Sequence, residues 1–286
     1  MTKREVVELP QALVSKIQET ISNYAIGFVG VRDPGTGQNP GKDQDGYVAG
    51  SGTLVSFGKS RGILTAAHVL KNLGRPQEYE FVLPFPRAKR HRLSVPAQHC
   101  ETVLIGPSQN EADGPDIACL VLSDADARRI EPYKSFYDLE ALKREVLYNP
   151  ADLTIGVWQL VGMIEEMTKD ADVQPRQERV KEFWCLMGEV GFPVETARDG
   201  YDFLDSEIKP PAGEVAPDSF GGTSGGALWH ILLGRKDDVV DATKFVLSGV
   251  AYFESRQPNR RSIISNGRRT IYDKMLGALP AGKKDS

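Results

Sequence analysis

Residues 219–229 read SFGGTSGGALW, a stretch that places Ser224 among four glycines just before an apolar run. Glycine permits sharp turns and lets another group approach the backbone closely. Such a setting suits a serine hydroxyl that attacks a carbonyl, because the flanking N–H groups can face the oxygen on which negative charge develops. The alternative is a glycine-rich loop without a chemical role. The rest of the chain has to distinguish these interpretations.

One candidate chemistry is the sharp turn of α/β-hydrolases, since residues 222–226 have the pattern G-x-S-x-G. That fold supplies its acid and its histidine after the serine. Only His230 follows Ser224, in the same apolar segment, and the residues before the serine have a loop-like composition. The position of His230 and the loop-like segment before Ser224 therefore disfavour an α/β-hydrolase.

A second candidate is a Ser-His-Asp arrangement in the chain order histidine, aspartate, serine. His68 ends the segment TAAH, for which we predict the end of a strand, and Asp116 begins the predicted strand DIACLVL. The chain resembles the trypsin-like (chymotrypsin-fold) serine peptidases, and is most similar to their bacterial HtrA-like branch without a PDZ domain. The shared motifs are Gly50-Ser51-Gly52, Thr65-Ala66-Ala67-His68-Val69, Asp116-Ile117-Ala118 and Gly222-Thr223-Ser224-Gly225-Gly226-Ala227-Leu228.

The resemblance implies a serine endopeptidase that works through an acyl-enzyme, without a metal or an organic cofactor. Ser224 is then the nucleophile, His68 the base, and Asp116 the group that orients the imidazole. The N–H groups of Gly222 and Ser224 form the expected oxyanion hole. The expected partners are a protein or peptide substrate and a regulatory protein. The alternative is a latent or catalytically silent module of the same fold that binds peptides or a partner protein.

Substrate preference is expected from two further segments. Asp218 lies six positions before the nucleophile (224 − 6 = 218), where the resemblance implies the base of the primary pocket and cleavage after Arg or Lys. The alternative is a solvated loop residue after Pro217. On the predicted strand 244–255, Tyr252 and Phe253 are expected to line the pocket, and Glu254 to narrow it or add an acidic contact.

Short strands with turn signals predict an all-β barrel or sandwich. The resemblance implies two antiparallel six-stranded-type barrels, and we expect terminal helices and a partly helical insertion in addition. The separations 116 − 68 = 48 and 224 − 116 = 108 suit two successive barrels. Leu13, Ile17 and Ile21 repeat at helical spacing. We expect one peptidase unit over 1–286: helix 1–24, first barrel 25–125, connecting insertion 126–180, second barrel 181–268, and C-terminal helix and tail 269–286.

Composition excludes several other classes. A net charge of −4 gives no broad electrostatic surface for nucleic acid. The first residues hold no apolar core of a signal peptide, and no stretch approaches the length of a membrane span. We therefore expect a cytoplasmic protein that binds neither nucleic acid nor membrane.

Overall fold

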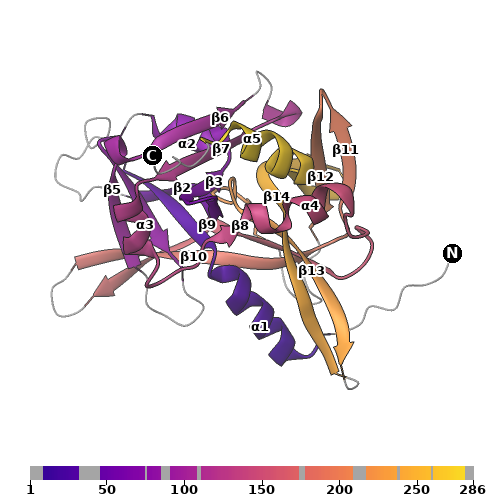
Figure 1. Cartoon of the computed structure of the whole chain (residues 1–286). Helices are drawn as coiled ribbons and strands as arrows, with labels where there is room; N and C mark the ends of the chain where they lie inside the picture. Colours follow the sequence, from indigo (N-terminus) through magenta and orange to yellow (C-terminus); the bar gives the residue numbers. More distant parts are fainter. Residues whose placement is uncertain are drawn as a thin grey trace.

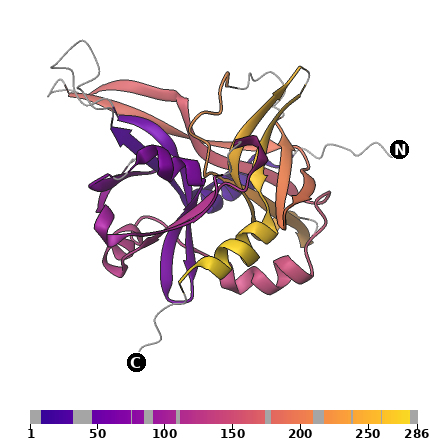
Figure 2. The same cartoon turned by 90° about the horizontal axis from the view of Figure 1, so that it is seen from above.

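The computed structural model describes residues 9–31, 46–74, 76–84, 91–107, 111–173, 178–208, 217–236, 239–258 and 260–280. Two β-sheets dominate this part of the chain (Figure 1). Figure 2 shows the first sheet (indigo to magenta) and the β11–β15 part of the second (orange to yellow) on different sides of the molecule.

The first sheet has eight strands, and seven of them form a continuous antiparallel path in the order β5-β4-β1-β2-β3-β7-β6. The eighth strand, β8, pairs in parallel with β2. The strands are β1 (Ala25–Val31), β2 (Gly46–Phe57), β3 (Ser60–Thr65), β4 (Glu78–Leu83), β5 (His91–Pro96), β6 (Glu101–Ile105), β7 (Ile117–Leu122) and β8 (Tyr137–Asp138).

The second sheet has seven strands in the order β10-β9-β13-β14-β15-β12-β11. Its strands are β9 (Val157–Val173), β10 (Glu178–Val190), β11 (Val194–Arg198), β12 (Tyr201–Glu207), β13 (Ala227–Lys236), β14 (Val239–Gln257) and β15 (Arg260–Asn266). Strand β9 also contacts β1 and β2 of the first sheet.

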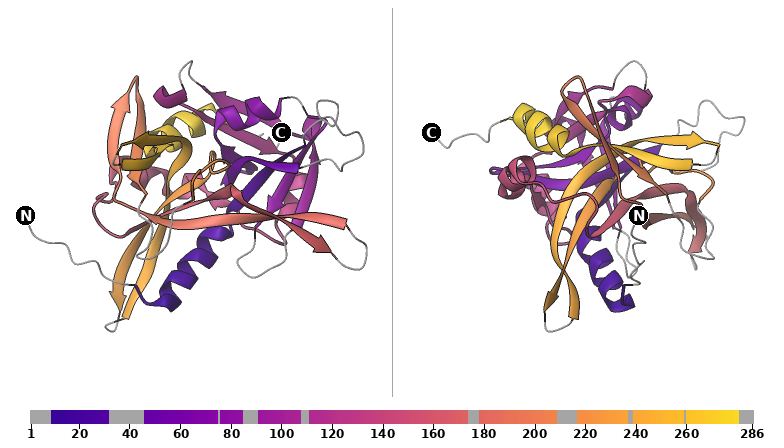
Figure 3. Two further views of the ribbon diagram at one scale, coloured as in Figure 1. Left: turned by 180° about the vertical axis from the view of Figure 1, so that it is seen from behind. Right: turned by 90° about the vertical axis from the view of Figure 1, so that its right-hand side faces the viewer.

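Helical segments connect and flank the sheets. They are α1 (Gln11–Ser22), α2 (Ala67–Leu73), η2 (Ala97–His99), η3 (Glu111–Asp113), α3 (Asp124–Ile130), α4 (Leu139–Tyr148), the π-helical η4 (Thr270–Met275) and α5 (Leu276–Ala278). Helix α1 lies beside the β13–β14 hairpin (Figure 3), and Lys16 Nζ lies 2.8 Å from the Asp241 carboxylate there. Its apolar face is buried as the helical spacing predicts.

The all-β fold class with two antiparallel sheets and terminal helices is confirmed, with three differences. The sheets hold eight and seven strands rather than six each. Residues 157–173, which we expected in the connecting insertion, form β9 inside the second sheet. His68 lies in the first turn of α2 rather than at a strand end, because β3 stops at Thr65.

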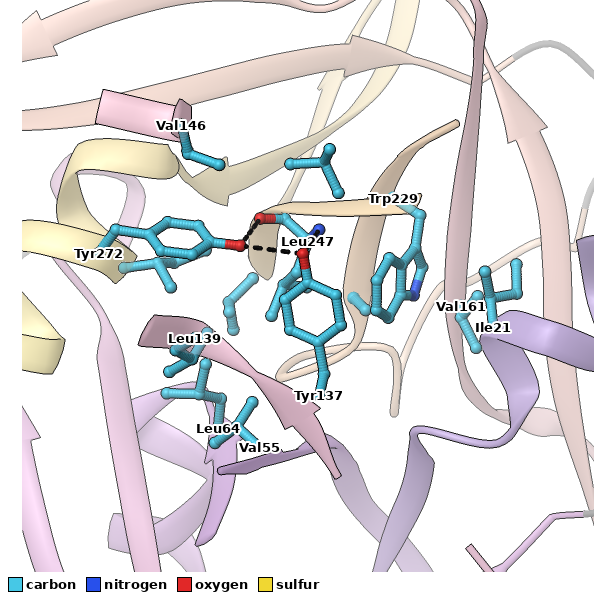
Figure 4. Packing of buried hydrophobic residues seen from close by; sticks show 14 of the residues in the cluster. Ile21, Val55, Leu64, Tyr137, Leu139, Val146, Val161, Trp229, Leu247 and Tyr272 are labelled. Atoms are coloured by element: carbon cyan, nitrogen blue, oxygen red, sulfur yellow. Dashed lines mark hydrogen bonds between the residues drawn. The ribbon is translucent and has the colours of Figure 1, made fainter. Parts of the chain in front are cut away.

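A buried aromatic cluster joins the two sheets (Figure 4). Tyr137 of β8 packs edge-on against Trp229 of β13, with 5.1 Å between the ring centroids. The Tyr272 hydroxyl donates to the carbonyl of Leu247 at 3.0 Å and also contacts the Tyr137 hydroxyl at 3.4 Å. Since these groups come from both sheets and from the C-terminal helical segment, the cluster ties the three together.

Candidate active site

His68 and Asp116 form a hydrogen-bonded pair. Nδ1 of His68 lies 2.5 Å from Oδ2 of Asp116, and the backbone N–H of His68 donates to Oδ1 at 2.9 Å. The Asp116 side chain is fully buried, whereas 19% of the His68 side chain is exposed. A carboxylate only accepts hydrogen bonds, so the proton of the neutral imidazole sits on Nδ1. Nε2 is therefore left with a lone pair that can accept a proton.

Asn266, at the end of β15, holds the backbone of Asp116. Its Oδ1 accepts from the N–H of Asp116 at 3.1 Å, and its Nδ2 donates to the Asp116 carbonyl at 2.7 Å. Nδ2 also lies 3.3 Å from the carbonyl of Val250 on β14. Asn266 was not among the site residues expected from the sequence, because the residue it holds is 150 positions away in the chain.

The Ser224 loop requires glycines for conformational and steric reasons. Gly222 has φ +90° and Gly225 has φ +86°, a region that L-residues with side chains rarely adopt. A Cβ atom on Gly225 would also lie 2.0 Å from the carbonyl oxygen of Ser51. Substitution at either position would force the loop to move.

Hydrogen bonds fasten this loop to both sheets. The carbonyl of Ser224 accepts from the N–H of Ser51 on β2 at 2.7 Å. The N–H of Gly225 donates to the carbonyl of Ala251 on β14 at 2.7 Å. The loop therefore bridges the first and second sheets.

Ser51 is buried and holds several segments together. The sequence indicated it only as part of the Gly50-Ser51-Gly52 motif. Its hydroxyl donates to the Gly222 carbonyl at 2.6 Å and accepts from the N–H of Met163 on β9 at 2.7 Å. Its own carbonyl accepts from the Thr65 hydroxyl at 2.7 Å, just before the helix that carries His68. One serine thus links the His68 segment, the Ser224 loop and β9.

The N–H groups of Gly222 and Ser224 are the expected oxyanion donors. Within the described part of the chain, neither of them donates to a protein acceptor. The N–H groups of the intervening and following residues do: Thr223 donates to Phe220 at 3.0 Å and Gly225 to Ala251. The N–H groups of Gly222 and Ser224 are therefore available to donate to a ligand oxygen.

Ser224 lies close to the helix of His68 but is not hydrogen bonded to the imidazole. A Cβ atom on Gly50 would lie 2.5 Å from a methyl group of Val69 and 3.1 Å from the carbonyl oxygen of Ser224, so both segments meet there. The Ser224 hydroxyl is 3.5 Å from the carbonyl of Tyr252, a long hydrogen bond. Among the described residues, no hydrogen bond joins it to His68.

A pocket of about 150 Å³ opens beside Ser224. Tyr252, Phe253 and Glu254 of β14 line it, as expected from the sequence. Asp218 is exposed and does not line this pocket, which differs from its expected place at the pocket base. The full lining is Ser219, Phe220, Gly221, Thr223, Ser224, Ala251, Tyr252, Phe253, Glu254 and Ile263.

The described residues hold no group of three or more His, Cys, Asp or Glu side chains arranged to bind a metal ion. No helix among them has the length and apolarity needed to cross a bilayer. The expected cytoplasmic location stays a prediction.

No protein-family model matches the chain. No curated protein matches it either. Among solved structures, tobacco vein mottling virus protease matches at 10% identity with a TM-score of 0.41, covering 100% of this chain and 94% of that one. A tobacco etch virus protease complexed with product matches at 10% identity and a TM-score of 0.38, covering 96% and 86%.

A third structure comes from work on coupled folding and binding of the intrinsically disordered Sesbania mosaic virus VPg protein. It matches at 10% identity with a TM-score of 0.41, covering 90% of this chain and 92% of that one. Similarity this low assigns no family, substrate or residue role to the chain.

Proposed function

We propose that the protein is a serine endopeptidase with His68, Asp116 and Ser224 as its catalytic residues. The observation that carries the proposal is the His68–Asp116 pair, joined by a ring and a backbone hydrogen bond, in a segment that meets the Ser224 loop at Gly50. A serine hydroxyl becomes a nucleophile when a nearby base takes its proton. In such sites a buried carboxylate orients the base, and a glycine-rich loop carries the serine.

The proposed reaction proceeds in two steps. Oγ of Ser224 attacks the carbonyl carbon of the peptide bond while its proton passes to Nε2 of His68, and the C–N bond then breaks as that proton moves to the departing amine. A water molecule next attacks the acyl carbonyl carbon and gives one proton to Nε2 of His68. The C–Oγ bond then breaks as His68 returns that proton to Oγ, which releases the carboxylic acid product and restores the Ser224 hydroxyl. Asp116 keeps its charge and stabilises the imidazolium in both steps.

The N–H groups of Gly222 and Ser224 are proposed to stabilise the tetrahedral intermediates. Their availability within the described residues supports this role. Removing one such donor typically lowers the rate by about 10² to 10³. Since both donors are backbone groups, the glycine conformations at Gly222 and Gly225 are what present them.

A latent form of the same peptidase is the second candidate, and one observation favours it. The Ser224 hydroxyl contacts the Tyr252 carbonyl rather than His68. A ligand or regulatory protein that rotates this side chain would complete the site, although catalytic hydrogen bonds also often tighten only when substrate binds.

Cleavage after Arg or Lys stays a prediction. It depends on a carboxylate at the base of the primary pocket, and the exposed position of Asp218 gives it no support. The test is the substitution Asp218→Ser, with cleavage after Arg or Lys measured relative to cleavage after other residues. This ratio falls only if the Asp218 carboxylate contacts the substrate.

A fluorophosphonate probe tests the proposed chemistry directly, because it reacts covalently with activated serines. We expect labelling of the wild type at Ser224 and none of Ser224→Ala, with His68→Ala reduced by roughly 10³ or more. Ser56→Ala, on the same strand as Ser51, is a control for nonspecific labelling. Labelling that persists in Ser224→Ala would remove Ser224 as the nucleophile, and no labelling with any candidate activator would leave a silent binding module.

A further inference from the structure

The carboxylate of Glu254 is fully occupied by neighbouring donors. Oε1 accepts from Nε of Arg256 at 3.0 Å and from Nε of Arg261 at 2.5 Å. Oε2 accepts from a terminal nitrogen of Arg256 at 3.1 Å and from the N–H of Phe220 at 3.2 Å. An ionised carboxylate offers about four acceptor positions, so Glu254 has none left for a substrate cation.

The same two arginines hold the backbone of the pocket wall. Arg261 donates to the carbonyls of Pro217 and Asp218, the latter at 2.9 Å, and its guanidinium lies 4.6 Å from the ring centroid of Phe220. Arg256 also donates to the carbonyl of Asp218, at 2.7 Å. The ion pairs therefore act as a clamp on residues 217–220.

Glu166 of β9 holds the same segment through its backbone N–H groups. Its two carboxylate oxygens accept from the N–H of Asp218 at 3.2 Å and of Ser219 at 2.8 Å. The segment is thereby held through both its carbonyl and its N–H groups, by charged side chains from the three strands β9, β14 and β15. We call Glu166, Glu254, Arg256 and Arg261 the wall clamp.

The pocket itself presents no free charge. Of the described residues that line it, Glu254 alone is charged, and neither Arg256 nor Arg261 is part of the lining. The remaining walls are aromatic, aliphatic, hydroxyl or glycine groups. A charged substrate side chain would lose its hydration here without gaining a partner of opposite charge. Burial acts to raise the pKa of Glu254, but its hydrogen bonds to Arg256 and Arg261 hold that pKa below the usual value.

We propose that the pocket beside Ser224 receives an uncharged, mainly apolar side chain on the acyl side of the cleaved bond, and that Glu254 is a positioning residue of the wall clamp. This inference rests on the proposed peptidase function and names its substrate class. It predicts exclusion of charge where the resemblance implies basic specificity, because the carboxylate of Glu254 is already paired on both oxygens.

Peptidyl phosphonates that differ only in the side chain entering this pocket (Leu, Val, Lys, Arg or Glu) test the proposal, since each modifies an activated serine without turnover. We expect the Leu and Val probes to modify Ser224 at least about tenfold faster than the charged probes. Arg256→Gln should free one acceptor position on each Glu254 oxygen. We expect it to raise the ratio of the Lys-probe rate to the Leu-probe rate by about tenfold. Arg256 is suited to this change because 58% of its side chain is exposed.

Arg92→Gln removes a comparable arginine from the Arg92–Glu80 pair in the first sheet, and should leave the ratio unchanged. Faster reaction of a charged probe with the wild type, or equal rates for all probes, would overturn the charge exclusion while keeping Ser224 as the nucleophile. A ratio that Arg256→Gln does not alter would overturn the role of Glu254. If no phosphonate or fluorophosphonate modifies Ser224, the peptidase function fails and this inference fails with it.

Discussion

At the scale of single residues, the candidate site depends on side chains that orient other groups. Asp116 orients His68 through two hydrogen bonds, and Asn266 in turn holds the backbone of Asp116 from both its N–H and its carbonyl. Ser51 holds the Ser224 loop, because its hydroxyl donates to the carbonyl of Gly222. Each of these groups is buried, so each has few alternative partners.

Replacing Asn266 by Leu tests this support. The change would leave the N–H and carbonyl of Asp116 without their buried partner, which costs roughly 1–3 kcal/mol per unsatisfied group. We expect a lower free energy of unfolding and, for a folded protein, slower fluorophosphonate labelling of Ser224, because the His68–Asp116 geometry changes.

Calorimetry and the rate of fluorophosphonate labelling would measure the two effects. Asn149→Leu, at the exposed end of α4, is the matched control. A folded variant with an unchanged labelling rate and reduced stability alone would show that Asn266 only supports the fold.

At the scale of secondary structure elements, helix ends and strand ends place the important side chains. Asp138 caps α4 by accepting from the N–H groups of Glu140 and Ala141. Helix α2 begins just after β3 and so carries His68 toward Asp116. The C-terminal helical segment is capped by a residue of another element. Asp202 of β12 accepts hydrogen bonds from the N–H groups of Arg269 and Thr270.

Asp202→Ala should loosen the C-terminal helical segment from β12. The two N–H groups and the Thr270 hydroxyl would lose a buried acceptor, so we expect a loss of about 1–3 kcal/mol in the free energy of unfolding. Urea unfolding of the variant against wild type measures it. Asp273→Ala, in the same segment but exposed, should cost much less; equal losses would contradict the capping role.

At the scale of the whole molecule, buried titratable groups couple stability to pH. His230 of β13 is fully buried, stacks on Trp158 at 4.2 Å between ring centroids, and donates from Nε2 to the carbonyl of Ile155. Its Nδ1 is buried and has no hydrogen-bond partner in the described part of the chain. Burial lowers the pKa of His230, and the nearby positive charge of Arg268 lowers it further.

A lowered pKa means that the unfolded chain binds a proton more readily than the folded protein. The contribution of His230 to stability is therefore complete above the unfolded pKa of about 6.5 and declines as the pH falls from there toward the folded pKa. We expect His230→Phe, which keeps an aromatic ring against Trp158, to flatten the stability–pH curve in this window.

Urea unfolding at several pH values between 4 and 8 would measure the difference between the two proteins, so that other titrating groups cancel. His99→Phe is the control, because 45% of the His99 side chain is exposed. Parallel curves for wild type and His230→Phe would mean that His230 does not titrate on unfolding.

The sequence by itself determined the all-β class, the N-terminal helix and the candidates His68, Asp116 and Ser224 in their chain order. These predictions depend on local patterns: side-chain periodicity, and glycines where the backbone turns. The tertiary structure alone decided that β9 belongs to the second sheet, that Asn266 holds Asp116, that Asp218 lies outside the pocket, and that Arg256 and Arg261 occupy the Glu254 carboxylate. Those features depend on contacts between residues far apart in the chain, and no local pattern encodes which strands pair or which arginines reach a given carboxylate.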